Sequence, residues 1–216
     1  MGEVIQLAER RARRRGSHGT PGGGGVLRAE FIFDLACPFT YLAAERVERA
    51  FEAVAWTPAS GSALTRRGAG DDAGADRRLR RAVEQRAAEL RMPLVWPERF
   101  PDEVPAAMRV ATLAAERGRG PAFTLAAGRL AYCGGFDLED PEILAEAAAA
   151  AGLSLDECLA AARDVRRDGL LEAAGRRLLA TGADRLPALC VGRALFWGEE
   201  RVVEAVAAAR LHAAAQ

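Results

Sequence analysis

The residue with the clearest chemical potential is Cys37, which begins the segment CPFT, with Pro38 next and Thr40 three positions on. Proline favours the first position of a helix, so Cys37 is predicted to precede one, its sulfur facing unpaired N–H groups and the positive end of the helix dipole. Such surroundings lower a thiol pKa from about 8.5 to roughly 3.5–7.5. The pattern predicts an activated thiolate, and an inert, structural cysteine is the alternative.

Thr40 occupies the position at which a dithiol site carries its second cysteine. An internal disulfide cannot form at this turn, so two reactions stay open. In one, Cys37 forms a mixed disulfide that an external thiol resolves. In the other, Cys37 binds and polarises a thiol substrate without being oxidised. The Thr40 hydroxyl can hydrogen-bond the sulfur or simply occupy the first helical turn.

The remaining cysteines and histidines offer weaker candidates. Cys133, Cys158 and Cys190 match no disulfide scaffold and no metal-binding pair, and the pattern favours core packing for Cys158 and Cys190. Proximity to Cys37 would make Cys190 a second redox partner. The two histidines, His18 and His212, lie near the chain ends, so a Cys-His dyad or a metal site is not expected.

The composition narrows the class of protein. The 216 residues include 30 basic and 30 acidic side chains, every basic one is arginine, and the formal net charge is zero. A general nucleic-acid binder is therefore not expected, and mechanisms that need a lysine are excluded. No window approaches eighteen consecutive apolar residues, and the N-terminus lacks a secretory pattern. We expect no membrane association and a cytoplasmic location.

Hydrophobic patterning predicts strands at both ends of the chain and helices between them. AEFIFDL (29–35) and VAWTP (54–58) are typical of strands, and the helical pattern over 39–53 joins them into a βαβ unit with parallel strands. ALCV and ALFW predict a hairpin over 188–197, followed by a helix over 199–212. The expected helices between these units span 76–91, 105–118, 121–132, 141–151, 154–163 and 166–180.

This order of elements predicts an α/β protein with a thioredoxin-like fold, βαβ…ββα, interrupted by a long all-helical insertion. Residues 28–60 and 184–216 would form the thioredoxin-like domain, and residues 61–183 the inserted helical subdomain. Residues 1–27, rich in arginine and glycine, are predicted to be a flexible tail. The substrate pocket is expected between the turn at Cys37 and the helical block.

Several segments carry a resemblance to a known family. FIFDLACPFTYL resembles the first strand and active-site turn of the DsbA-like thioredoxin superfamily, in the branch of 2-hydroxychromene-2-carboxylate isomerases and kappa-class glutathione transferases. Four further segments are similar to that branch in the same order: RMPLVWPERFP, AAMRVATLAAERGRG, FDLEDPEILAEAAAAAGL and DRLPALCVGRALFWGEERVVEA. Together they cover nearly all of residues 29–206.

The resemblance implies a thiol-binding loop. Leu186 and Pro187 match the cis-proline loop, whose backbone pairs with glutathione or another thiol substrate. In the segment FWGEER, which includes Trp197, Glu200 matches the acidic residue that contacts the glutamyl end of glutathione, and Arg201 follows it. The co-substrate implied is glutathione or another low-molecular-weight thiol, with no metal.

The sequence also departs from the family pattern. The isomerases and transferases usually have serine at the position of Cys37, and the disulfide oxidoreductases have cysteine at that of Thr40. Glu200 replaces the usual aspartate. The expected function is thiol-disulfide exchange on a small thiol or disulfide through Cys37, with Pro38 and Thr40 in the catalytic turn. The alternatives are a glutathione-dependent isomerase or transferase, and a thiol-binding module without catalysis. The resemblance also implies a homodimer as one candidate oligomeric state.

Overall fold

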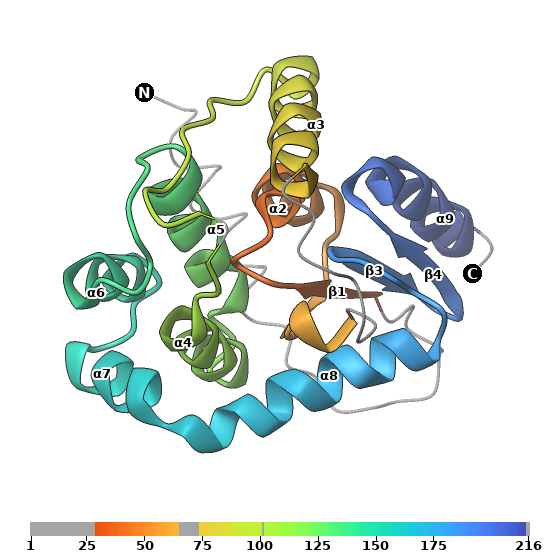
Figure 1. The fold of residues 1–216 in the computed structure, drawn as a ribbon. Helices are drawn as coiled ribbons and strands as arrows, with labels where there is room; N and C mark the ends of the chain where they lie inside the picture. Colours follow the sequence, from red (N-terminus) through yellow and green to blue (C-terminus); the bar gives the residue numbers. More distant parts are fainter. Residues whose placement is uncertain (1–28, 65–73, 101, 215–216) are drawn as a thin grey trace, which may run out of the picture.

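The computed structural model describes residues 29–64, 74–100 and 102–214 (Figure 1), so the predicted tail lies outside the described residues. In chain order the elements are β1 (Ala29–Phe33), α2 (Pro38–Ala50), β2 (Ala55–Pro58), η1 (Ser62–Leu64), α3 (Ala75–Leu90), α4 (Pro105–Glu116), α5 (Gly120–Tyr132), α6 (Pro141–Ala150), α7 (Leu155–Arg163), η2 (Val165–Arg167), α8 (Asp168–Ala180), β3 (Ala188–Val191), β4 (Ala194–Trp197), η3 (Glu199–Arg201) and α9 (Val202–Ala214).

Four strands form one mixed sheet in the order β2-β1-β3-β4. β1 pairs in parallel with β2 and antiparallel with β3, which confirms the predicted βαβ unit and joins the early strand-forming region to the late one. The predicted hairpin is also present, because β3 and β4 pair around a turn at which Gly192 has φ +60°, a conformation that favours glycine.

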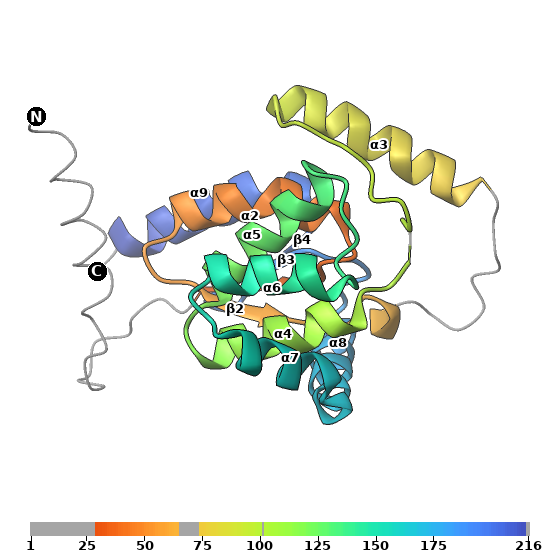
Figure 2. The same ribbon diagram turned by 90° about the vertical axis from the view of Figure 1, so that its left-hand side faces the viewer.

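The alternation along β1 separates two layers of core. Phe31 and Phe33 belong to the cluster shared with α2 and α4, whereas Ile32 belongs to a smaller cluster with α8. Figures 1 and 2 show α2 and α9 on one side of the sheet and α8 on the other. Trp56 of β2 meets Phe31 edge to face, with ring centroids 4.8 Å apart.

Between the two strand-forming regions, the described residues contain only helices and loops. The sheet and this helical block together form an α/β thioredoxin-like architecture. Local start signals act as expected: the Asp140 side chain accepts the N–H of Glu142, and Ser154 forms a capping box with Glu157. The first predicted helix extends too far, because the chain becomes extended at Phe51. None of the described helices has the length and apolarity needed to cross a membrane.

Candidate functional site

Cys37 lies where the turn after β1 meets the Leu186–Pro187 loop. It is the residue that precedes α2, with an extended backbone, and Pro38 occupies the first turn, as the sequence predicts. The Cys37 Sγ–H donates to the carbonyl oxygen of Leu186 at 3.4 Å, across 149 positions of sequence. The Leu186–Pro187 peptide bond is cis. The fold therefore places the backbone of the proline loop directly against the sulfur.

The prediction of a lowered pKa at Cys37 is wrong. Burial raises the pKa of this thiol to about 11, and the nearby Asp34 carboxylate acts in the same direction. The N–H groups of Phe39 and Thr40 lower the pKa, as the helix argument anticipates, but their effect is smaller than the loss of hydration. Cys37 is consequently a neutral thiol at neutral pH, able to donate a hydrogen bond.

Thr40 lies one turn into α2 and faces the cysteine. Its residue is 1% exposed, and its hydroxyl has no hydrogen-bond partner among the described residues. The hydroxyl is near enough to Cys37 to act on the pKa of the thiol, in the lowering direction. An unpaired buried hydroxyl beside a sulfur is available to hydrogen-bond that sulfur or a second one bound to it.

The turn before Cys37 is held by side chains that sequence reasoning missed. The Asp34 carboxylate accepts the N–H of Ala36 at 2.9 Å and that of Gly61 at 2.7 Å. The buried Leu35 N–H donates to the thioether sulfur of Met108, in α4, at 3.2 Å. Burial raises the pKa of Asp34. An isolated aspartate ending an apolar strand was the only local signal for this role.

Tyr132 fixes the same turn from α5. Its hydroxyl donates to the carbonyl oxygen of Ala36 at 2.8 Å and lies 3.3 Å from that of Leu35. Burial raises the pKa of Tyr132 well above its usual value, so the phenol keeps its proton. With Met108, Tyr132 couples the helical block directly to the backbone that carries Cys37.

The residues of the predicted thiol-binding segment lie beside the proline loop but differ in environment. The Gly198 N–H donates to the carbonyl oxygen of Pro187 at 2.8 Å, which joins the two segments next to half-buried Trp197. Glu200 is exposed and accepts from Arg185 at 2.8 Å.

Arg201 stands over the ring of Phe196, with its guanidinium carbon 5.6 Å from the ring centroid, and it pairs with Glu204. The loop side of Cys37 thus carries two arginines, Arg185 and Arg201, together with the exposed carboxylate of Glu200.

Glu199, rather than Glu200, is the buried acid of this segment. Its side chain is 1% exposed and forms ion pairs with Arg46 of α2 and Arg86 of α3. A second bond joins the Arg86 Nη2 and the Glu199 Oε1 at 3.2 Å. The sequence shows two adjacent glutamates, and only tertiary packing decides which one is buried.

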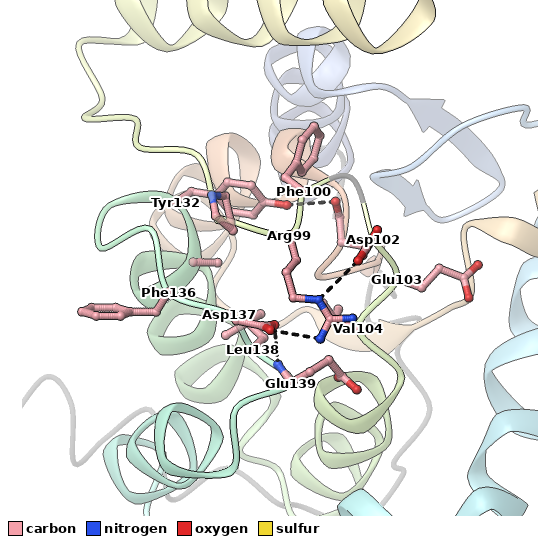
Figure 3. Close-up of a pocket in the computed structure, with 13 residues that line it drawn as sticks. Arg99, Phe100, Asp102, Glu103, Val104, Tyr132, Phe136, Asp137, Leu138 and Glu139 are labelled. Carbon is pink, nitrogen blue, oxygen red and sulfur yellow. Dashed lines mark hydrogen bonds and ion pairs between the residues drawn. The ribbon is translucent and has the colours of Figure 1, made fainter. Parts of the chain in front are cut away.

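Two hollows flank the turn on the side of the helical block, where the sequence predicts a pocket. One, of about 30 Å³, is lined by Ala36, Tyr132 and the loop between α3 and α4 (Figure 3). The other, of about 190 Å³, is lined by Asp34, Met108 and residues at the start of α8. Cys37 itself lines neither hollow, although Ala36, the residue before it, lines the smaller one and Asp34 lines the larger one.

The other cysteines form no disulfide with Cys37. All four thiols are free, and Cys158 is fully buried in the core. Cys190 lies in β3 opposite Glu30, and burial raises its pKa. The Cys133 sulfur lies 3.0 Å from the hydroxyl of Tyr41. No group of three or more metal-ligating side chains occurs within the part of the chain that the structure describes.

Comparison with known proteins places the fold in a family. A sequence profile of the DSBA-like thioredoxin domain matches residues 29–209. The structure of a 2-hydroxychromene-2-carboxylate isomerase superposes with a TM-score of 0.74 at 14% identity, covering 88% of this chain and 99% of that one. A probable DsbA oxidoreductase from Streptomyces coelicolor gives 0.64 at 22% identity, covering 88% and 92%. No curated protein sequence matches the chain significantly.

Proposed function

Because the chain belongs to the DSBA-like thioredoxin domain family, we propose that it is a thiol-dependent enzyme in which Cys37 acts as a neutral hydrogen-bond donor. In this proposal Cys37 donates to the sulfur of a bound low-molecular-weight thiol, glutathione or a similar co-substrate, and stabilises its thiolate. The thiol proton is released to solvent, and the bound thiolate then adds to an electrophilic carbon–carbon double bond of a second reactant, whose displaced electron pair takes up a proton, as in a glutathione-dependent isomerase or transferase. Cys37 is neither oxidised nor alkylated.

One observation carries this proposal: the Cys37 thiol, with a pKa of about 11, already donates to the Leu186 carbonyl oxygen at 3.4 Å. A bound sulfur beside the Leu186 loop can replace that carbonyl as the acceptor. Hydrogen bonds to charged acceptors are about twice as strong as neutral ones, so the donated bond favours a thiolate over a thiol. The unpaired hydroxyl of Thr40 offers a second donor.

The residues beside the loop fit a thiol that carries an amino acid group. Glu200 is an exposed carboxylate that can exchange its contact with Arg185 for an ammonium group. Arg185 and Arg201 are partly exposed and can bind carboxylates. Half-buried Trp197 supplies apolar surface in the same segment.

Monothiol exchange through Cys37 is the second candidate. The N–H groups of Phe39 and Thr40 favour a thiolate at Cys37, and a bound disulfide that moves the Asp34 carboxylate away from the sulfur would lower the pKa of the thiol. In exchange, a Cys37 thiolate attacks one sulfur of a disulfide, a mixed disulfide forms, and the other sulfur leaves as a thiol that takes up a proton.

Thiol binding without oxidation tests the proposal. We expect reduced glutathione, cysteine or coenzyme A to bind saturably in titration calorimetry, while intact-mass spectrometry shows an unmodified Cys37. Glu200→Gln should weaken glutathione binding more than binding of a thiol without an ammonium group. Failure of all three thiols to bind would contradict the proposal. Rapid turnover of Cys37 through a mixed disulfide would instead support exchange.

A further inference from the structure

We infer that Glu103 sets the charge preference of the site, so that the second reactant, approaching Cys37 from the helical block, is cationic or neutral rather than anionic. This inference rests on the proposed function only in assigning the reactant to that side. The carboxylate of Glu103 borders both hollows beside the turn that carries Cys37.

Glu103 is exposed in the loop that leads into α4, and it lines the small hollow on one side and the larger one on the other. Figure 3 shows its side chain pointing away from the group formed by Arg99, Asp102 and Asp137. Within the described ranges, Glu103 has no hydrogen bond or ion pair. Its charge is one of the causes that raise the pKa of Asp34, so the two carboxylates lie near each other.

The other carboxylates of the small hollow are compensated. Arg99 forms ion pairs with Asp102 at 3.3 Å and with Asp137 at 3.4 Å, so one guanidinium partly neutralises both carboxylates. Glu139 accepts the N–H of Ala106 at 2.9 Å at the start of α4, where the positive end of the helix dipole offsets its charge. Arg99 is thus already engaged and does not supply a free cation for an anionic reactant.

The same holds in the larger hollow. Asp168 forms a two-pronged pair with Arg109, at 2.7 and 2.8 Å. Glu172 pairs with Arg176 at 2.8 Å. Neither arginine lines the hollow. Among the residues that the structure describes around this hollow, Glu103 and Asp34 remain without a cationic partner.

The two sides of Cys37 therefore differ in charge. On the proline-loop side, Arg185 and Arg201 are balanced by their carboxylate partners, whereas the described residues around the larger hollow include Glu103 and Asp34 without a cationic partner. A like charge brought into the hollows is repelled, and an opposite charge is attracted, over distances shorter than the Debye length. The isomerase of similar fold is named for a carboxylate substrate. The negative charge of Glu103 disfavours the binding of a carboxylate reactant on this side of the present protein.

Charged thiol reagents of similar size test the inference at Cys37. Aminoethyl, methyl and sulfonatoethyl methanethiosulfonate carry positive, zero and negative charge. Each forms a disulfide with Cys37, expels methanesulfinate and releases the thiol proton to solvent. The rate at which each reagent modifies Cys37 is followed by peptide mass spectrometry at low ionic strength. It is divided by the rate at which the same reagent modifies N-acetylcysteine. We expect the normalised rate to be highest for the cationic reagent, lower for the neutral one and lowest for the anionic one.

Glu103→Gln should reduce the cation-to-anion rate ratio at Cys37 by roughly three- to tenfold, the effect of one nearby charge in a partly hydrated site. Glu52→Gln is the matched control, because Glu52 is exposed beyond the far end of α2, and it should leave the ratio unchanged. Added salt should reduce the ratio in the wild-type protein.

A ratio near one, a ratio unaffected by Glu103→Gln, or failure of every reagent to reach Cys37 would overturn the inference. None of these results bears on thiol binding in calorimetry, so failure of the charge preference is distinguishable from failure of the proposed function.

Discussion

Replacing Cys37 by serine should preserve thiol binding, whereas replacing it by alanine should weaken it strongly. Serine retains a neutral hydroxyl that can donate to a bound thiolate, and alanine removes the donor. Loss of a hydrogen bond to a charged group costs about 1.5–3 kcal/mol, which corresponds to a roughly 10- to 150-fold weaker Kd for the thiolate. The Cys37→Ser value should stay within about threefold of the wild type.

The measurement is the Kd for glutathione by titration calorimetry, together with the ultraviolet absorbance of the bound thiolate in each variant. Thr40→Val is a useful companion, because it removes only the neighbouring unpaired hydroxyl. Equal binding by the serine and alanine variants would show that Cys37 is no donor to the substrate. Loss of all activity in Cys37→Ser, with normal thiol binding, would identify exchange as the reaction.

Replacing Glu199 by glutamine should destabilise the protein more than any other single charge removal in the described structure. Glu199 is 1% exposed and joins Arg46 of α2 to Arg86 of α3. Removing one partner of a buried ion pair costs about 3–5 kcal/mol, because the remaining charges stay partly desolvated. Arg46 and Arg86 keep 23% and 27% exposure, and Arg86 also pairs with Glu89, so we expect the lower end, about 3 kcal/mol.

Urea unfolding gives the free energy of unfolding directly, and the neighbouring glutamate provides the control. Glu200→Gln removes an exposed pair with Arg185, which should cost less than about 1 kcal/mol. Hydrogen exchange should also show faster exchange in α3 of Glu199→Gln, because this ion pair ties α3 to the rest of the fold. Equal stability of the two variants would show that the Glu199 cluster contributes no more than a surface pair.

The architecture was largely predictable because local patterns and long-range packing agree. The apolar run at 29–33, the hairpin over 188–197 and the helix starts at Asp140 and Ser154 all appear where periodicity and capping place them. Cys37 precedes α2 because Pro38 specifies the first turn. Differences at helix ends, as at Phe51, arise where the chain must turn toward the next strand.

The electrostatics of the site were not predictable from the turn alone. Helix geometry argues for a low pKa at Cys37, but the pKa depends on burial by segments more than a hundred residues away, including the Leu186 loop. The roles of Asp34, Tyr132 and Met108 likewise arise only when the helical block packs on the turn.

Adjacent residues of one type raise the same difficulty at Glu199 and Glu200. The family pattern directs attention to Glu200, which the structure leaves exposed, while the ion-pair network forms around Glu199. Neither charge nor spacing distinguishes them in a sequence. Only the direction of each side chain after the turn at Gly198, where φ is +94°, separates a surface carboxylate from a buried one.

The pH dependence of Cys37 alkylation tests the central claim most directly. Iodoacetamide labelling of Cys37 would be followed by peptide mass spectrometry across the neutral and alkaline range, with N-acetylcysteine as the reference and circular dichroism to confirm the fold. A neutral donor with a pKa of about 11 predicts a labelling midpoint well above that of a free thiol, about 8.5. A midpoint below about 7.5 would show an activated thiolate and contradict the account.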